Sequence, residues 1–391
     1  MSSGVWPARI RTQLDQLVEN GLWRTPREFD ARGPVGALEG ADVVSFASND
    51  YLGLSTHPKV VAAARDALER WGTGAGASRL VTGSRPIHSR LERALAEWKR
   101  TEAAICFPTG FAANLGVLSV LGGPGVRVLS DELNHASIID GCRLSRSELA
   151  IFRHRDLAHL HALLRSADGA ATPKLVVTDT VFSMDGDVAP IDELLNLCER
   201  YDALLILDEA HAVLGPHLPE TRTSGARWNV VRVGTLSKTL GALGGFVAAS
   251  HDVVDLLVNR ARSYIFSTAL PPADAAAALA SLEVVRSAEG QALTNRLAAH
   301  VERLSCSGLA ATDHPSPIVP VIFGREQAAL SASAALLAEG IWVPAIRPPT
   351  VPPDTSRLRV TVSAAHRDED VGRLIEALVP LYAAARAGAL G

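Results

Sequence analysis

The chain has 391 residues, of which 47% are hydrophobic and 20% charged, a composition typical of a globular protein with a large core. A formal net charge of −4 and a pI near 6.3 argue against a nucleic acid or an anionic membrane as the main partner. The four cysteines are widely separated, and no apolar stretch approaches the roughly twenty residues that span a bilayer, so we expect no disulfide framework, no metal site, no membrane anchor and a cytoplasmic location.

The first part of the chain predicts an N-terminal helical arm over residues 1–45. Apolar residues recur at helical spacing over residues 9–22, and a proline then interrupts the pattern. A short strand follows at 43–46, and a helix is expected over 58–71. The glycine-rich loop 72–78 lacks the full Gly-x-Gly-x-x-Gly pattern and follows no strand, which disfavours a dinucleotide site.

Residues 46–270 predict a large α/β domain, and residues 271–391 predict a smaller C-terminal α+β domain. In the large domain, short apolar runs alternate with helical stretches, which indicates βαβ units and a mostly parallel sheet. The expected strands there are 103–107, 126–129, 175–178, 204–207 and 230–233. The C-terminal part has Ala/Leu-rich helices, then expected strands near 318–323, 341–343 and 358–362, and a last helix from 368 to about 385.

Two residues of the large domain predict a cofactor. Only four of the 38 basic residues are lysines, and Lys238 lies in a glycine- and hydroxyl-rich turn where arginine would serve equally well as a surface cation. Unlike arginine, lysine can lose its proton and form a Schiff base with an aldehyde. Asp208 follows the apolar run 204–207, at the edge where open α/β sheets bind ligands. A buried carboxylate there needs a cation, and the pyridinium nitrogen of pyridoxal phosphate is one.

Two other interpretations compete with the cofactor. The sequence Asp208-Glu-Ala-His211 also resembles the Mg²⁺-binding strand end of nucleic-acid helicases, but such a motor needs a Gly-x-x-x-x-Gly-Lys-Ser/Thr loop upstream. The chain contains no Gly-Lys pair. Alternatively, Lys238 is an incidental lysine in a surface loop, and Asp208 is a solvated aspartate at the end of a strand. The residues that surround these two in the sequence favour the cofactor.

Further residues at strand ends complete the expected site. The backbone N–H groups at a helix N-terminus suit a phosphate, although such a turn is often purely structural. With two nearby hydroxyls, the expected phosphate-binding residues are Thr109, Gly110, Phe111, Thr235 and Ser237. His135 follows another strand end and could stack on the pyridine ring or be an ordinary loop residue. His211 could donate to the phenolic oxygen of the cofactor, and Ser183 follows a fourth strand end.

The motifs resemble, in order, those of the α-oxoamine synthases, over roughly residues 45–370. They are Asn49-Asp-Tyr-Leu-Gly-Leu54, Thr109-Gly-Phe-Ala-Ala-Asn114, Asn134-His-Ala-Ser137, Val181-Phe-Ser-Met-Asp-Gly186, Asp208-Glu-Ala-His211, Thr235-Leu-Ser-Lys238 and Phe266-Ser-Thr-Ala-Leu-Pro-Pro272. The resemblance implies a pyridoxal-phosphate enzyme of fold type I, the aspartate-aminotransferase fold. It also implies a homodimer with active sites at the subunit interface.

The resemblance also implies a role for each residue. Lys238 would hold the cofactor and then remove the α proton, Asp208 would keep the ring nitrogen protonated, and His135 would stack on the ring and polarise the keto group. Thr268 would reach the phosphate of the neighbouring subunit. The substrate-binding residues would be Arg24, Asn49, Thr350 and Arg359. Arg359 would hold the substrate carboxylate, because a guanidinium suits a planar two-point contact.

The segment Arg347-Pro-Pro-Thr-Val-Pro352 resembles the branch of the family that condenses L-alanine with a pimeloyl thioester in biotin biosynthesis. The alternatives are 2-amino-3-oxobutyrate CoA ligase, 5-aminolevulinate synthase, serine palmitoyltransferase and secondary-metabolite aminoketone synthases. An inactive partner subunit is disfavoured, because such subunits typically lose the lysine. Segment 212–227 departs from the Gly-x-x-Gly-Arg-Gly loop usual in the family, so the acyl donor, CoA or carrier protein, stays open.

Overall fold

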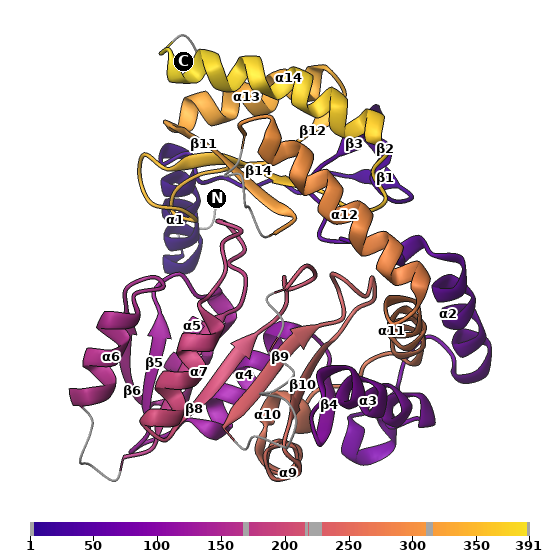
Figure 1. The fold of residues 1–391 in the computed structure, drawn as a ribbon, viewed down its shortest axis with the longest axis vertical. Coiled ribbons are helices and arrows are strands. Elements are labelled where there is room, and N and C mark those ends of the chain that lie inside the picture. The colour runs from indigo at the N-terminus through magenta and orange to yellow at the C-terminus, as the bar shows by residue number, and fades with distance from the viewer. Residues whose placement is uncertain (1–3, 167–171, 216–217, 219–228, 310–315, 389–391) are drawn as a thin grey trace.

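The computed structural model describes residues 4–166, 172–215, 218, 229–309 and 316–388. Figure 1 shows a larger α/β body and a smaller body above it, with helix α12 (Ala288–Cys306) running between them. The arrangement is the fold type I architecture that the motifs predicted, with a large, mostly parallel sheet in one body.

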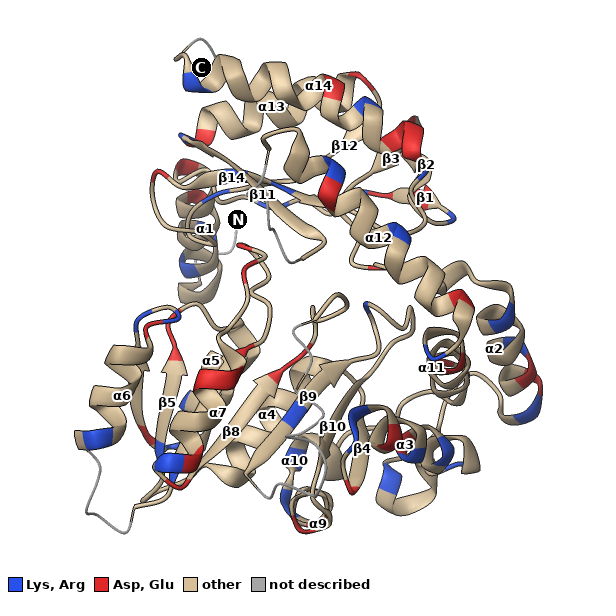
Figure 2. Cartoon of the chain, viewed as in Figure 1, with Lys and Arg blue, Asp and Glu red and all other residues tan. Residues whose placement is uncertain are grey.

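The larger body is built on a sheet of seven strands within the described residues, in the order β4-β10-β9-β8-β7-β5-β6. Strands β5 to β9 run parallel, whereas β10 is antiparallel to both of its neighbours. The strands are β4 (Ala103–Phe107), β5 (Arg127–Asp131), β6 (Glu148–Phe152), β7 (Lys174–Asp179), β8 (Ala203–Asp208), β9 (Val230–Thr235) and β10 (Gly245–Ala249). The parallel strands therefore end at one common edge, and Figure 2 shows acidic residues there, at the ends of β5 and β8.

All five strands expected in this body are confirmed, but β6 and β10 were missed. Strand β6 lies at the sheet edge, and most of its residues are exposed although Leu149 to Phe152 are apolar. So short an apolar run does not by itself distinguish a strand from part of a helix. Strand β10 contains one glycine and two alanines, which have low β-propensity, and only its pairing with β4 and β9 makes it a strand.

Helices cover both faces of this sheet. Alternate residues of a strand face opposite sides, so Leu175 and Val177 pack with α4 and α5, whereas Val176 packs with α6 and α7. The helices of this body are α2 (Pro58–Trp71), α3 (Pro86–Lys99), α4 (Gly110–Leu121), α5 (Ala136–Ser145), α6 (Leu157–Ser166), α7 (Ile191–Arg200), α9 (His251–Arg260), α10 (Arg262–Ile265) and α11 (Pro272–Val285). Of the helices in the described ranges, none is long and apolar enough to cross a membrane.

The smaller body contains two small sheets. One is antiparallel in the order β11-β14-β13, and the other has the order β1-β2-β3-β12. The strands are β1 (Phe29–Ala31), β2 (Val35–Leu38), β3 (Ala41–Ser45), β11 (Ile318–Gly324), β12 (Ile341–Trp342), β13 (Ala345–Ile346) and β14 (Ser356–Thr361). Helices α12, α13 (Glu326–Ala338) and α14 (Asp368–Arg386) contribute to the same core as β11, β12 and β14.

The structure differs from the helical arm expected over residues 1–45. Among the described residues of this segment, only α1 (Val5–Glu19) is helical, and β1 to β3 lie within residues 29–45. Strands β2 and β3 are joined by Glu39 and Gly40, both with positive φ, which is the geometry of a two-residue hairpin turn. The pair Glu-Gly is a weaker turn signal than Asn-Gly, so the sequence pattern did not reveal the hairpin. Strand β3 then pairs in parallel with β12, which joins this segment to the smaller body.

The boundary expected at residue 271 also differs. Helix α11 packs against α2 and α3 of the larger body, in a cluster that includes Leu91, Ala275 and Leu282. The smaller body gains its own helices only from α12 onward. An Ala/Leu-rich composition shows that both α11 and α12 are helices, but it does not show which core each of them joins.

Candidate active site

Most of the predicted site residues line one pocket at the carboxyl edge of the parallel strands. Those that line it are Thr109, Gly110, Phe111, His135, Ser183, Asp208, His211, Thr235, Ser237 and Lys238. They come from the ends of β4, β5, β7, β8 and β9 and the turns that follow. Residues distant in the sequence meet here because parallel strands end at the same edge of a sheet.

Asp208, the last residue of β8, is buried, and its two oxygens have different partners. Asn114 of α4 donates its side-chain N–H to Oδ2 at 2.6 Å, and the backbone N–H of Ala210 donates to Oδ1 at 2.9 Å. Asp179 ends β7 directly beside Asp208 in the sheet. Burial and the charge of Asp208 raise the pKa of Asp179 well above its usual value. Two adjacent buried carboxylates favour a cation in this pocket.

His135 caps the N-terminus of α5 and has a defined tautomer. Its Nδ1 lies 3.2 Å from the backbone N–H of Ser137 and 2.8 Å from the Ser137 hydroxyl. That hydroxyl accepts a hydrogen bond from Asn114 at 2.9 Å, so its own proton points to Nδ1. The ring proton of neutral His135 is therefore on Nε2. Burial lowers the pKa of His135, which favours this neutral form.

Lys238 lies in the turn after β9, and its Nζ is 2.7 Å from Nε2 of His211. Nδ1 of His211 is in turn 2.5 Å from the hydroxyl of Tyr51, which lies 3.2 Å from Oδ1 of Asn49. Burial lowers the pKa of Lys238, although the charges of Asp208 and Asp179 oppose this. Burial and the charge of Lys238 lower the pKa of His211 well below its usual value. Neutral His211 therefore accepts a hydrogen bond from the Lys238 ammonium at Nε2 and donates one to the Tyr51 hydroxyl from Nδ1.

Helix α4 begins at the pocket, where Thr109 and Gly110 are part of the lining. Thr109 is its N-cap, and the threonine hydroxyl accepts from the backbone N–H of Ala112 at 3.0 Å. The Thr235 and Ser237 hydroxyls lie 2.7 Å apart beside this helix end. A Cβ on Gly110 would approach the Cβ of Thr235 to 3.2 Å, so glycine allows this close contact. The helix N-terminus and the hydroxyls form a site suited to an anion.

Arg359 on β14 brings the smaller body to the pocket. It is buried, and its guanidinium donates to the carbonyl of Ser183 at 2.5 Å, to Oγ1 of Thr361 at 2.8 Å and to Oδ1 of Asn49 at 3.1 Å. All three acceptors are neutral. Asn49 and Tyr51 connect the guanidinium to His211, and the charge of Arg359 lowers the pKa of Lys238 and His211. A buried arginine bound to neutral oxygens retains its attraction for a carboxylate.

Five predicted residues do not line the pocket: Asn49 and Arg359, which contact each other, and three more. Arg24 follows α1, Thr268 precedes α11, and Thr350 lies in the turn after β13; all three are exposed. Thr268 forms an isolated β-bridge with Ser78. Within the unusual segment 212–227, residues 216–217 and 219–227 lie outside the described residues.

Sequence reasoning missed four polar residues of the site: Tyr51, Asn114, Ser137 and Asp179. Asp179 follows the apolar run of β7, just as Asp208 follows that of β8, so the same strand-end signal applied to it. The other three lie inside the quoted motifs, but only their tertiary contacts show that they touch His211, Asp208 and His135.

Comparisons with known proteins agree on the family. Residues 41–378 match the family described as aminotransferase class I and II. An 8-amino-7-oxononanoate synthase of Anaeromyxobacter dehalogenans is 50% identical over 94% of this chain and 94% of its own length, and one of Geobacter sulfurreducens is 46% identical over 94% and 96%. A solved serine palmitoyltransferase from S. paucimobilis, with a bound PLP–myriocin aldimine, is 30% identical and superposes with a TM-score of 0.87 over 97% of this chain and 98% of that one.

Proposed function

Since the chain belongs to the α-oxoamine synthases, within the class I and II aminotransferase family, we propose that it condenses L-alanine with a pimeloyl thioester to give 8-amino-7-oxononanoate for biotin biosynthesis. In this reaction the α carbon of alanine displaces the thiol of the thioester, and the alanine carboxyl group leaves as carbon dioxide. The observation that carries the proposal is the convergence of Lys238 and Asp208 on one pocket, with Arg359 bound to the carbonyl of the pocket residue Ser183. The shared name of the relatives supports the choice of substrates.

The pocket fits pyridoxal phosphate. The neighbouring carboxylates Asp208 and Asp179 favour a protonated ring nitrogen, and the start of α4 with Thr235 and Ser237 suits the phosphate. Bound pyridoxal phosphate supplies an aldehyde that takes up an amino acid and a ring that stabilises negative charge on its α carbon. Ser183 and Phe111 also line the pocket and would hold the ring region.

Lys238 is the proposed holder of the aldehyde and the base that removes the α proton of alanine. Its lowered pKa makes the free amine more accessible near neutral pH, and His211 at 2.7 Å can accept or return a proton. His135 offers its Nε2–H to the pocket because Nδ1 is occupied by Ser137. We assign this N–H to the oxygen of the thioester carbonyl, where negative charge develops.

Arg359 is the proposed partner of the alanine carboxylate, with Asn49 orienting the guanidinium. Arg24 and Thr350 are exposed and outside the pocket, so we propose that they contact the acyl chain after the segments around them close on it. Thr268 is proposed to complete the phosphate site of a second subunit, since its own pocket does not contain it.

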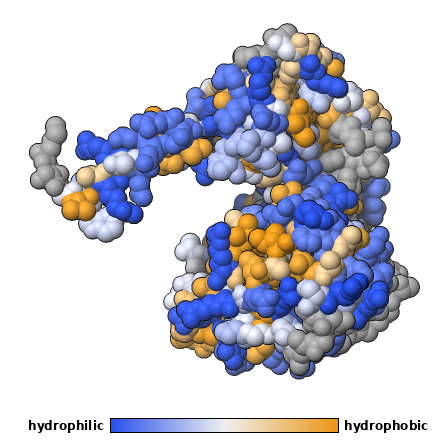
Figure 3. Space-filling model, turned by 90° about the vertical axis from the view of Figure 1, so that its left-hand side faces the viewer, coloured by the Kyte–Doolittle hydropathy of each residue, from blue (hydrophilic) through white to orange (hydrophobic). Residues whose placement is uncertain are grey.

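The proposal includes a homodimer. Every described residue of α1 is exposed, and its apolar side chains include Trp6, Ile10, Leu14 and Leu17. Figure 3 shows this helix standing clear of the rest of the chain. An isolated helix of this length is marginal in water, so another surface must cover its apolar face. Removal of residues 1–20 should convert the dimer to a monomer in light scattering, whereas an unchanged mass would remove the arm from the interface.

We also propose that the enzyme works in the cytoplasm. Cys106, Cys142 and Cys198 are buried as free thiols, and Cys306 is an exposed free thiol. An exposed unpaired cysteine is typical of a reducing compartment. Fractionation of the native host, followed by immunoblotting, would test the location.

A panel of substrates tests the reaction. Protein loaded with pyridoxal phosphate should be yellow, and L-alanine should change its absorption more than glycine or L-serine. Thiol release should then have its highest kcat/KM with L-alanine and a pimeloyl thioester, compared with acetyl, succinyl and palmitoyl thioesters. Comparing pimeloyl-CoA with a pimeloyl carrier protein would identify the donor. Faster turnover of glycine with acetyl-CoA, or of serine with palmitoyl-CoA, would assign another reaction of the family.

A further inference from the structure

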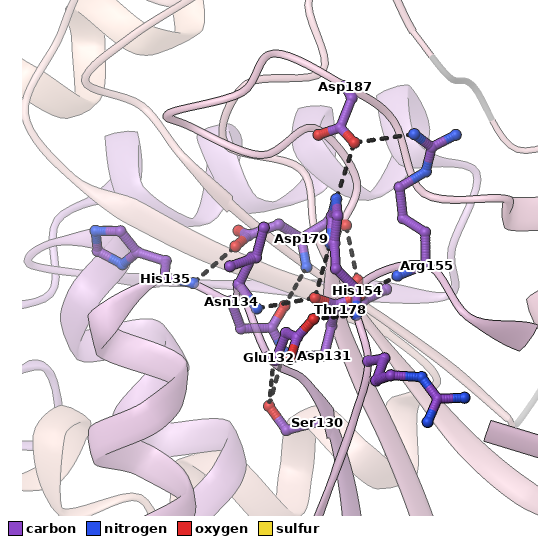
Figure 4. A network of polar contacts seen from close by, with 12 residues as sticks. Ser130, Asp131, Glu132, Asn134, His135, His154, Arg155, Thr178, Asp179 and Asp187 are labelled. Carbon is purple, nitrogen blue, oxygen red and sulfur yellow. Dashed lines mark hydrogen bonds and ion pairs between the residues drawn. The ribbon is translucent and has the colours of Figure 1, made fainter. Parts of the chain in front are cut away.

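His154 lies in the turn between β6 and α6 and connects two carboxylates, as Figure 4 shows. Its Nδ1 is 3.0 Å from Oδ1 of Asp131, and its Nε2 is 2.8 Å from Oδ2 of Asp187. The ring also meets Phe182 edge-on, with centroids 4.3 Å apart. Because ionised carboxylates only accept hydrogen bonds, both contacts require a proton on each ring nitrogen. The geometry therefore makes His154 an imidazolium.

The two carboxylates belong to loops that carry pocket residues. Asp131 ends β5 and begins the turn that leads to His135, and its Oδ1 also accepts the backbone N–H of Leu133 at 2.9 Å. Asp187 closes the loop 181–187, which carries Ser183. The His154 bridge thus ties the turn before His135 to the loop of Ser183.

The loop 181–187 also contacts the smaller body. The carbonyl of Ser183 accepts from Nε of Arg359 at 2.5 Å, and Asp185 pairs with Nη1 of Arg357 at 2.5 Å. Both arginines lie on β14, and both are buried. A shift of this loop would therefore move the guanidinium of Arg359.

From these contacts we infer that His154 is a positioning residue, whose imidazolium holds the turn of His135 and the loop of Ser183 together and so places Arg359 for the carboxylate of the amino-acid substrate. This inference rests on the proposed function for the ligand of Arg359. His154 is not among the residues that line the pocket. His154 takes no part in a covalent step of the reaction.

The charged groups that face His154 explain how it stays protonated. Asp131 and Glu132 approach from the β5 turn and Asp187 from the loop 181–187, while Arg155 on its own turn shares Oδ2 of Asp187 at 2.9 Å. Burial opposes the charge, but the hydrogen bonds to Asp131 and Asp187 outweigh burial and raise the pKa of His154 to about 9. Because this lies above the usual value of 6.5, the bridge stabilises the fold fully below about pH 6.5 and is lost as the pH rises through about 9.

Titration of the holoenzyme with L-alanine, followed by absorbance, tests the inference. At about pH 7 the Kd for alanine should rise about 10- to 100-fold in His154→Gln, because both donors of glutamine are on one nitrogen and its carbonyl oxygen cannot donate to the second carboxylate. The matched control His159→Gln, in the same segment but outside the bridge, should keep the wild-type Kd. The ratio of the His154→Gln and wild-type Kd values should fall towards one above about pH 9, since wild type then loses its imidazolium. Comparison at equal pH cancels the ionisation of alanine itself.

Thermal unfolding of the protein without added cofactor gives a second measurement. The Tm of His154→Gln should lie below that of wild type at about pH 7, and the two should converge above about pH 9. If His154→Gln does not fold, Asp187→Asn removes one carboxylate with little change in shape and should show the same pattern. An unchanged alanine Kd at about pH 7, or a ratio independent of pH, would overturn the inference. The titration needs no acyl donor. Failure of pimeloyl thioesters as substrates would therefore reject the proposed reaction but would not bear on the role of His154.

Discussion

Lys99 is buried and Lys238 is partly buried, and these two lysines occupy different surroundings near the end of β8. Nζ of Lys99 lies 2.7 Å from the carboxylate of Glu209, which also binds Arg232 at 2.6 Å. Lys238 instead contacts the neutral ring of His211 and faces the pocket that Asp208 lines. The neighbouring acidic residues Asp208 and Glu209 thus take part in two separate clusters.

The difference shows what marks a functional lysine. Burial lowers the pKa of both Lys99 and Lys238, so the direction of the shift does not distinguish them. Lys99 has a direct ion pair and also lies over the ring of Trp98 at 3.7 Å, which leaves its amine engaged. Lys238 has a neutral hydrogen-bond partner and an open pocket. Both lysines line pockets, so the direct ion pair of Lys99, which Lys238 does not have with Glu209, separates the two.

Replacement of Lys238 should have the largest effect. Lys238→Ala should lose at least the 10²- to 10⁴-fold in kcat that a general base typically supplies, because the amine both holds the aldehyde and moves the α proton. The matched control is Lys59→Ala, whose side chain is 70% exposed and which should keep wild-type turnover. Thiol release measures both. Turnover of Lys238→Ala at the wild-type rate would mean that another residue is the base.

Replacement of Glu209 should affect stability rather than chemistry. Glu209→Gln leaves Lys99 and Arg232 without their carboxylate and should lower the free energy of unfolding by about 3–5 kcal/mol, the usual cost of breaking a buried ion pair. Urea unfolding followed by circular dichroism measures this. The paired variant Asp208→Asn should lower kcat with a smaller effect on unfolding. The opposite ranking of the two variants would contradict the separation of the clusters.

A fall in pH should weaken the cluster of Glu209, Lys99 and Arg232. Burial opposes the charge of Glu209, but Arg232 and Lys99 outweigh burial and lower its pKa to about 2. Because this lies below the usual value of 4.5, the carboxylate stabilises the fold above about pH 4.5, and this contribution is lost as the pH falls towards about 2. The difference in Tm between wild type and Glu209→Gln should therefore shrink as the pH falls below about 4.5. A difference that stays constant would place the stabilisation elsewhere.

Replacement of Ser137, which lines the pocket of Lys238, should have the smallest effect of these changes. Ser137→Ala removes a hydrogen bond to Nδ1 of His135 of about 0.5–1.5 kcal/mol and leaves Asn114 without one acceptor. We expect kcat/KM to fall about two- to tenfold near neutral pH. The acidic limb of the pH profile should move to higher pH, because loss of that bond destabilises neutral His135. Ser137→Thr retains a hydroxyl and should restore the profile, whereas an unchanged profile in Ser137→Ala would disprove the tautomer assignment.

The residues at the carboxyl edge of the sheet were predictable. A short apolar run indicates a parallel strand, and a polar residue directly after that run must lie at the carboxyl edge of the sheet. Asp208 after its apolar run, and Thr109 before a helix, were found in this way. The hairpin of β2 and β3 was not found, since Glu39 and Gly40 form a tight turn without the usual sequence signal. The strand β10 depended on its neighbours for its identity.

The sequence by itself determined the type of fold, the family and the chemistry of Lys238, because these depend on local patterns and on residue types at fixed spacing. Only the tertiary structure decided which groups those residues contact. It places Asn114 on Asp208, Tyr51 on His211 and His154 between two loops. It also shows that Lys99, another of the few lysines in this sequence, is paired with Glu209. Charge compensation depends on distances between segments far apart in the chain, and these distances exist only after the sheet has formed.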